Sequence, residues 1–205
     1  MSPKHSTDVV VVTDSSCDLP ASIADDLGIV IVPLTIRFGD EEFIDRVELS
    51  TAEFWTRCVN SDTLPETAAP APGQFEQTYR AAAARGATGV VVVSLSSALS
   101  ATMQSAQLAA RAIADDPDID LDVRVIDSRT ISMGLGTIAL ACARAARDGA
   151  ADSSRVPCGP YARRNICRGP VAGRLRQASR QPEGVRNRPR SRHRFVSAPR
   201  RRGKH

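Results

Sequence analysis

Four consecutive valines, Val90 to Val93, directly follow Gly89 and precede a segment that is dense in hydroxyl side chains. An apolar run without polar alternation is typical of a strand that is buried on both faces of a parallel sheet. The hydroxyl segment, Ser94 to Ala106, leads into an alanine-rich helix that begins near Met103. The valine run therefore predicts a strand–turn–helix unit of an α/β fold.

The turn over Ser94 to Ala106 is a candidate anion site. The first N–H groups of a helix have no partner within the helix, and the helix dipole favours negative charge there. Serine and threonine hydroxyls add further donors at the same place. We therefore expect this turn to hold a carboxylate or a phosphate, although Ser97 or Ser100 could equally serve as a helix cap.

Apolar patterns and turn residues predict an alternation of strands and helices. We expect strands at 9–13, 29–38, 42–45 and 123–126, helices at 20–27, 50–59, 73–85, 103–115 and 131–147, and a loop over 63–72. Pro33 marks the second strand as an edge strand or a bulge. This order predicts an α/β fold with a mainly parallel sheet flanked by helices.

Three loops should meet at one edge of this sheet. They carry Asp14-Ser15-Ser16, Ser96 to Ser100, and Asp127-Ser128, and each follows a predicted strand. Because the carboxyl ends of parallel strands lie at the same edge, where ligands usually bind, we expect these polar residues to converge.

The charge of the chain changes abruptly near residue 150. Residues 1–150 contain 11 Lys and Arg and 21 Asp and Glu, whereas residues 151–205 contain 16 and 2. The second segment is rich in Arg, Pro, Gly and Ser and has almost no apolar periodicity, so it cannot bury enough apolar surface to offset its ordering entropy. We predict an acidic folded domain over 1–150 and a disordered basic tail over 151–205.

The expected compartment is the cytoplasm. No stretch reaches the roughly 18 apolar residues of a membrane span, and the N-terminus lacks the pattern of a signal peptide. The five cysteines are an odd number at low density, which favours a reducing environment. No membrane span is expected.

The residues argue against catalysis. The predicted folded domain contains one histidine, His5, and one lysine, Lys4, and both lie near the N-terminus. Neither a Ser–His–Asp nor a Ser-x-x-Lys arrangement therefore has its general base in place. Phosphate-binding glycine motifs are missing, since Gly134 and Gly136 match the dinucleotide fingerprint only in part. Asp14, Asp18 and Asp127 could hold a metal, but no further ligand pattern supports this. We expect binding without catalytic residues, cofactor or metal.

Five segments together resemble the DegV family of bacterial fatty-acid-binding proteins. In order along the chain, they are Val-Thr-Asp-Ser-Ser-Cys-Asp-Leu-Pro at 12–20, Val-Pro-Leu at 32–34, Thr-Ala-Ala-Pro-Ala-Pro-Gly-Gln-Phe at 67–75, Ser-Ser-Ala-Leu-Ser-Ala-Thr-Met-Gln-Ser-Ala at 96–106 and Val-Ile-Asp-Ser-Arg-Thr-Ile-Ser-Met-Gly-Leu-Gly at 125–136. The resemblance covers about residues 8–150. It implies the N-terminal one of two α/β domains that enclose a long-chain fatty acid, and, as in some members, a subunit that presents the lipid to a fatty acid kinase.

The resemblance also assigns site residues. Thr67 and Ser100 align with the family threonine and serine that contact the ligand carboxylate, and Ser97 and Thr102 would support them. Two departures stand beside these matches: the polar Ser-Gln after the family threonine is Ala-Ala here, and the glycine after the serine is Ala101.

The family's second domain is not recognisable after Gly149. The remainder has the composition of a GC-rich gene read in another frame. Because the resemblance implies that the second domain encloses part of the fatty acid, we expect its loss to impair lipid binding. The alternative function is nonspecific binding of nucleic acid by the arginine-rich tail, through contacts to the phosphate backbone.

Overall fold

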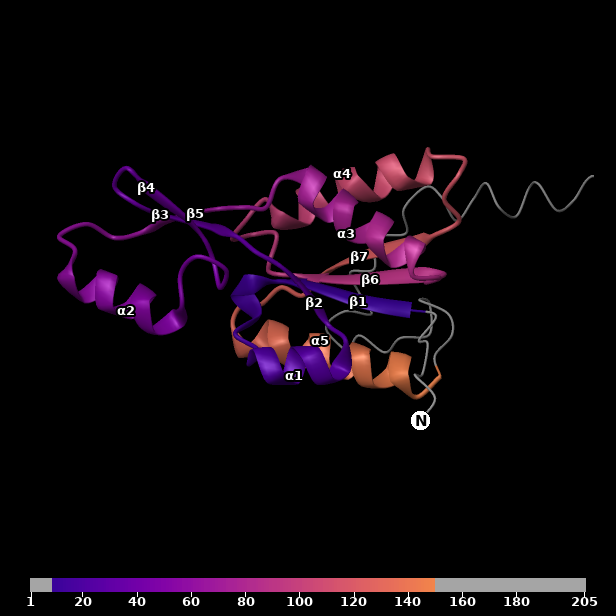
Figure 1. Ribbon diagram of the computed structural model, residues 1–205, viewed down its shortest axis with the longest axis horizontal. Helices are drawn as coiled ribbons and strands as arrows, with labels where there is room; N and C mark the ends of the chain where they lie inside the picture. Colours follow the sequence, from indigo (N-terminus) through magenta and orange to yellow (C-terminus); the bar gives the residue numbers. More distant parts are fainter. Residues whose placement is uncertain (1–8, 150–205) are drawn as a thin grey trace, which may run out of the picture. The chain divides into compact units, whose positions relative to one another are not determined.

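The computed structural model describes residues 9–149, and the predicted disordered tail over 151–205 lies outside this range. Four parallel strands form the central sheet in the order β2-β1-β6-β7 (Figure 1). They are β1 (Val9–Asp14), β2 (Val30–Val32), β6 (Gly89–Ser94) and β7 (Asp122–Asp127). Helices flank this sheet, so the predicted fold class is confirmed.

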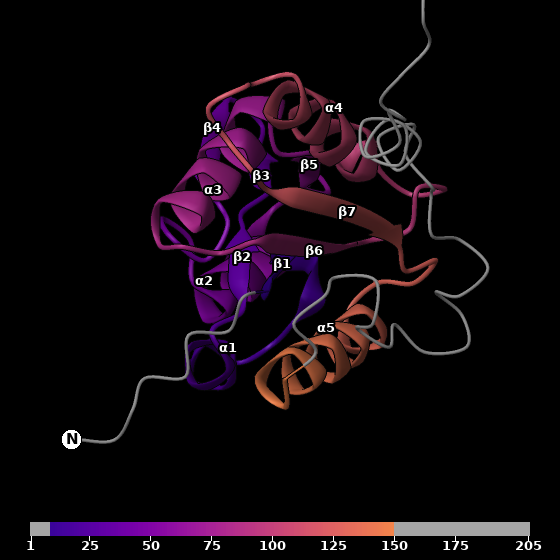
Figure 2. The ribbon, with the colours of Figure 1, turned by 90° about the vertical axis from the view of Figure 1, so that its right-hand side faces the viewer.

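The valine runs explain why the sheet is buried on both faces. Val91 and Val93 belong to a cluster with α1 (Ala21–Leu27) and α5 (Met133–Arg147), whereas Val90 and Val92 pack with α3 (Pro72–Ala84) and α4 (Thr102–Ala114). Figure 2 shows the two helix pairs on opposite sides of the strands. Full burial of each valine contributes about 1.5–3 kcal/mol, so the alternating side chains of one strand stabilise both layers.

A second, antiparallel sheet has the order β4-β3-β5. Its strands are β3 (Thr35–Phe38), β4 (Glu41–Ile44) and β5 (Glu66–Ala68), and α2 (Thr51–Asn60) lies between β4 and β5 in the chain. Ile36, Phe38 and Leu49 form a small core of their own, against which Phe54 packs. We call residues 35–68 the lobe.

Two sequence predictions for this region are wrong in detail. The strand expected over 29–38 is two strands in different sheets, because Pro33 lacks an N–H group and the next N–H, of Leu34, donates to Ser15 Oγ at 3.0 Å instead of continuing a ladder. The loop expected over 63–72 contains β5. In addition, α2 buries its apolar side chains only in part, since Trp55 is 62% exposed and Val59 83% exposed.

Two helix ends carry residues that favour them. Ser50 caps α2 by accepting a hydrogen bond from Glu53 N, and Gly28 ends α1 with a positive φ, as glycine allows without strain. Within residues 9–149, no helix has both the length and the apolar character needed to cross a membrane.

Candidate functional site

The polar loops converge at the carboxyl edge of the parallel sheet. Three backbone hydrogen bonds join them: Ser128 N donates to Ser94 O at 3.1 Å, Ser96 N to Thr130 O at 2.9 Å, and Ser132 N to Ser16 O at 2.9 Å. These bonds connect the loops after β1, β6 and β7. The predicted convergence is therefore confirmed.

The strand order reverses between β1 and β6. The chain leaves β1 toward β2 on one side, whereas β6 and β7 lie on the other, and ligands of open α/β sheets bind outside the strand ends at such a reversal. Asp14, at the end of β1, spans this point because its Oδ2 accepts a hydrogen bond from Leu95 N at 2.8 Å. This hydrogen bond links the ends of β1 and β6 directly.

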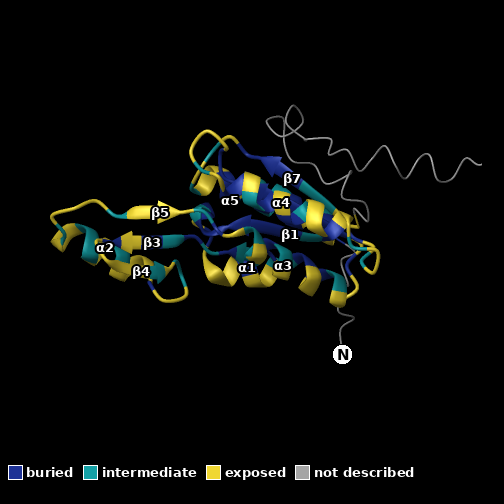
Figure 3. Ribbon diagram, turned by 90° about the horizontal axis from the view of Figure 1, so that it is seen from above, coloured by how far each residue is buried: buried dark blue, intermediate teal, exposed yellow. Residues whose placement is uncertain are grey.

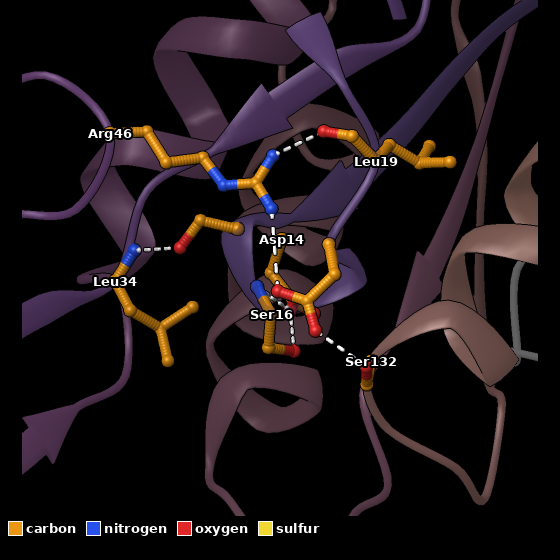
Figure 4. A network of polar contacts seen from close by, with 8 residues as sticks. Asp14, Ser16, Leu19, Leu34, Arg46 and Ser132 are labelled. Carbon is orange, nitrogen blue, oxygen red and sulfur yellow. Dashed lines mark hydrogen bonds and ion pairs between the residues drawn. The ribbon is translucent and has the colours of Figure 1, made fainter. Parts of the chain in front are cut away.

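Asp14 is a structural acceptor in a buried position. Burial raises the pKa of its carboxyl group, while hydrogen bonds from Ser16 Oγ, Leu95 N and Ser16 N act in the opposite direction. The shift remains upward because loss of hydration disfavours the charged form more than these donors favour it. Figure 4 shows Asp14 beside Ser16 in this network.

The two supporting hydroxyls named by the resemblance have different roles. Ser97 Oγ donates to Asp127 Oδ2 at 2.6 Å, so its proton is committed to a carboxylate within the protein. Thr102 is fully buried at the start of α4, and its Oγ1 lies 2.9 Å from Ser100 Oγ. Ser97 thus shapes the turn, and Thr102 stands next to the predicted ligand-binding serine.

Ser100 lies half-buried immediately before α4. Its Oγ accepts a hydrogen bond from Thr102 N at 3.3 Å, and Ala101 stands at the N-cap position without a side-chain cap. If the Thr102 hydroxyl donates to Ser100 Oγ, the hydrogen of Ser100 is free to donate outward. The arrangement offers a neutral donor next to the positive end of a helix dipole, which suits an anion.

Thr67 lies on the lobe, in the antiparallel sheet, whereas the serine turn follows β6 of the central sheet. It is the middle residue of β5, is exposed, and pairs with Ile36 of β3. In Figure 3, β5 is coloured as exposed, in contrast to the buried β1. The structure thus brings Ser97, Ser100 and Thr102 together in one turn, whereas Thr67 belongs to a separate sheet whose position depends on how the lobe is held.

A second polar network, which the sequence did not predict, lies around the loop after β1 (Figure 4). Arg46, which follows β4, donates from Nη1 to the carbonyl oxygen of Leu19 at 2.7 Å, and its Nη2 lies 3.6 Å from Asp18 Oδ1. Ser132 Oγ donates to the other oxygen of Asp18. No motif marks Arg46, because its partners lie 27 and 28 positions earlier in the chain.

The structure also gives a reason for Gly136, in the first turn of α5. A Cβ atom at Gly136 would lie 2.5 Å from Cys17 O and 3.1 Å from a methyl group of Leu19. This glycine therefore permits close contact between α5 and the loop after β1. Among residues 9–149, no group of three or more His, Cys, Asp and Glu side chains is placed to hold a metal ion.

A family model matches all of the described residues. The model, described as "Uncharacterised protein, DegV family", matches residues 8–154. A DegV domain-containing protein of Clostridium perfringens is 37% identical over 141 residues, which cover 69% of this chain and 48% of the relative. The chain thus spans about half the length of this curated relative.

Two solved structures share the fold. A protein from Bacillus subtilis, described as DegV, a fatty acid binding protein, aligns with a TM-score of 0.66 at 27% identity, over 72% of this chain and 50% of that one. A protein from Eubacterium ventriosum, described as binding stearic acid, aligns with a TM-score of 0.63 at 27% identity, over 68% of this chain and 47% of the other.

Proposed function

This chain belongs to the DegV family, and from that premise we propose that residues 9–149 form the head-group half of a fatty-acid-binding site. The observation that carries the proposal is the hydroxyl pair of Ser100 and Thr102, 2.9 Å apart at the start of α4. This pair lies in the loop after β6, beside the point where the strand order reverses. Relatives of the same fold are described as fatty acid binding proteins, one of them with stearic acid.

The binding chemistry follows from neutral donors. Ser100 donates its hydroxyl hydrogen to the ligand carboxylate, and Thr102, which is fully buried, orients Ser100 by donating to it. A hydrogen bond to a charged acceptor contributes about 1.5–3 kcal/mol, and the N-terminal end of α4 adds a favourable field. Thr67 supplies the second donor from the lobe, and Ser97 supports the turn by its bond to Asp127.

The proposed role is binding rather than catalysis. Among residues 9–149, the hydrogen bonds of the Ser100 and Thr102 hydroxyls involve no carboxylate or imidazole that could act as a general base. The carboxylates of Asp14 and Asp127 accept hydrogen bonds from other groups. The protein would work in the cytoplasm as the subunit that presents a bound fatty acid to a fatty acid kinase. In that role the carboxylate stays at the carboxyl edge of the sheet, where a partner enzyme reaches it.

Native mass spectrometry of the protein purified from bacteria tests the proposal. We expect co-purified long-chain fatty acid in the unaltered chain, and a loss of affinity of about 10- to 100-fold in Ser100→Ala and in Thr67→Ala. Ser105→Ala, one turn further into α4, and Thr63→Ala, elsewhere on the lobe, are matched controls and should retain the lipid. Absence of lipid from the unaltered chain, also after addition of palmitate, would reject the proposal.

The charge distribution supports a second, independent proposal. Residues 151–205 carry 16 Lys and Arg against 2 Asp and Glu, which favours nonspecific binding of nucleic acid through phosphate contacts. Filter binding at rising salt tests this, with retention expected at low salt and its loss at high salt. Retention at high salt, or no binding at low salt, would contradict it.

A further inference from the structure

Asp18 receives contacts from two elements that are distant in the sequence. Ser132, directly before α5, donates its hydroxyl to Asp18 Oδ2, and Arg46, directly after the β4 region, places Nη2 3.6 Å from Asp18 Oδ1. The same guanidinium donates to Leu19 O at 2.7 Å. Arg46 therefore joins the lobe to the loop after β1, and Ser132 fixes the carboxylate that receives it (Figure 4).

The turn that carries Arg46 is itself tied to the central sheet. Asp45 N donates to Leu34 O at 2.9 Å, and Leu34 N donates to Ser15 Oγ at 3.0 Å. These bonds act at the point where the chain passes from β2 to β3. Arg46 contacts Asp18 and Leu19, which follow η1 (Ser15–Cys17). The lobe is thus connected to the central domain both at Leu34 and at Arg46.

The backbone at this contact is unusual. The non-glycine residues with positive φ in the described chain are Asp18 (52°), Arg46 (65°), Arg129 (54°) and Ser132 (58°), and three of these four belong to the Arg46 contact. Such conformations are sparsely populated by residues with a Cβ, and they persist where the surrounding structure holds them. Their concentration at one contact indicates that its geometry is strongly determined.

The lobe has little else to orient it. Its core of Ile36, Phe38 and Leu49 is separate from the two clusters that pack against the central sheet. β5, which carries Thr67, is exposed along its whole length. The location of Thr67 relative to Ser100 therefore depends on the connections between lobe and sheet rather than on packing around β5.

We propose that Arg46 is a positioning residue that, through Asp18 and Leu19, holds the lobe so that Thr67 and Ser100 engage the same ligand head group. The part that concerns the ligand rests on the fatty-acid function proposed above; the mechanical part does not. Because the side chains of Arg46 and Asp18 are 24% and 58% exposed, the ion pair alone is weak, and the bond to the buried Leu19 carries most of the constraint.

Trp55 provides a direct readout, because it is the single tryptophan of the chain and lies on α2 in the lobe. The fluorescence anisotropy decay of Trp55 would be measured in the full chain and in Arg46→Met, which keeps the length of the side chain but removes its donors. Arg80→Met is the matched control, since Arg80 also pairs with two carboxylates, of Glu76 and Asp116, but lies on α3 outside the lobe. Fatty acid affinity and the free energy of unfolding would be measured for each protein.

We expect Arg46→Met to increase the nanosecond component of the Trp55 decay and to weaken fatty acid binding by about 3- to 10-fold, with neither effect in Arg80→Met. Ser132→Ala, which releases Asp18 from the opposite side, should change both quantities in the same direction by less. If Arg46→Met does not fold, the Trp55 decay and the fatty acid affinity of Ser132→Ala test the positioning role.

The outcomes separate the two proposals. Unchanged Trp55 dynamics in a folded Arg46→Met, or in Ser132→Ala where that variant decides, would overturn the positioning role. Faster dynamics with unchanged affinity would overturn its link to the head group. If the unaltered chain binds no fatty acid, the proposed function fails, and the anisotropy comparison still determines whether Arg46 holds the lobe.

Discussion

Ser97 and Asp127, thirty positions apart in the chain, form a double hydrogen bond at the carboxyl edge of the sheet. Ser97 Oγ donates to Asp127 Oδ2 at 2.6 Å, and Ser97 N donates to Oδ1 at 3.2 Å. Arg129 N also donates to Oδ1, at 2.9 Å. Burial alone would raise the pKa of Asp127, but these donors outweigh it and lower the pKa. The ionised carboxylate thus joins the loops after β6 and β7.

Asp127→Asn is expected to reduce the free energy of unfolding at pH 7 by about 1–3 kcal/mol, because it removes a charged acceptor from three donors. Since the folded pKa is lowered, the stabilisation is fully present above the unfolded pKa of about 3.9 and is lost as the pH falls through the folded pKa. The stability difference between the two proteins should therefore shrink in acid. Urea unfolding between pH 7 and pH 3 measures it.

Asp120→Asn, at an exposed position before β7, is the control for this series and should cost little at any pH. A difference between Asp127→Asn and the unaltered chain that stays constant down to pH 3 would contradict the assignment.

Gly136→Ala is expected to destabilise the fold by about 1–3 kcal/mol. The added Cβ would meet the backbone oxygen of Cys17 at 2.5 Å, so α5 or the loop after β1 has to move. Gly73→Ala is the matched control, because Gly73 is also helical and a Cβ there meets nothing within 4 Å. This control should be neutral or more stable by up to about 1 kcal/mol. Thermal unfolding compares the two, and equal effects would refute the steric argument.

Tyr79 should not ionise while the protein is folded. It is fully buried on α3, its hydroxyl donates to Ala106 O at 3.2 Å, and burial raises its pKa far above the usual value. Stability is then fully present below the unfolded pKa of about 10 and falls as the pH rises above it. In Tyr161→Phe, where Tyr79 is the remaining tyrosine, phenolate absorbance at 295 nm should appear only with loss of the circular dichroism signal. Phenolate in a folded protein near pH 10 would contradict this.

Cys58 should be the first of the cysteines at positions 17, 58 and 142 to react with a thiol reagent. Cys17 and Cys142 are buried and Cys58 is partly exposed, and burial raises the pKa of the Cys17 thiol, which keeps it protonated. With Cys158 and Cys167 replaced by serine, one thiol should react rapidly at pH 8 and two more only on unfolding. Rapid reaction of more than one thiol in the folded state would argue against this packing.

Strong local signals made much of the fold predictable. Val90 to Val93 indicated a strand buried on both faces, and apolar patterns with turn residues placed the helices within a few residues of their observed ends. β5 was not predictable because Glu66, Thr67 and Ala68 contain no apolar alternation. Its three residues form a strand because β3 offers an edge, with Ile36 opposite Thr67. Local sequence carries no information about such a distant partner.

The sequence predicted that the polar loops meet at one edge of the sheet, but not which hydrogen bond each hydroxyl group makes. The serine turn and the converging loops followed from strand order. The roles of Ser97, whose proton goes to Asp127, and of Ser100, which is paired with Thr102, depend on which groups the folded loops bring within hydrogen-bonding distance. From residue type alone, each of these hydroxyl groups is equally able to bind a ligand or to bond within the protein.

The sequence by itself determined the α/β class, the buried central strands and the hydroxyl-rich edge, because hydrophobic periodicity and helix-end chemistry act over a few residues. The tertiary structure alone decided that Pro33 divides one apolar segment between two sheets, that Gly136 allows α5 to approach Cys17, and that Arg46 meets Asp18 and Leu19. Each of these depends on contacts between residues far apart in the chain, whose geometry exists only after the layers have packed.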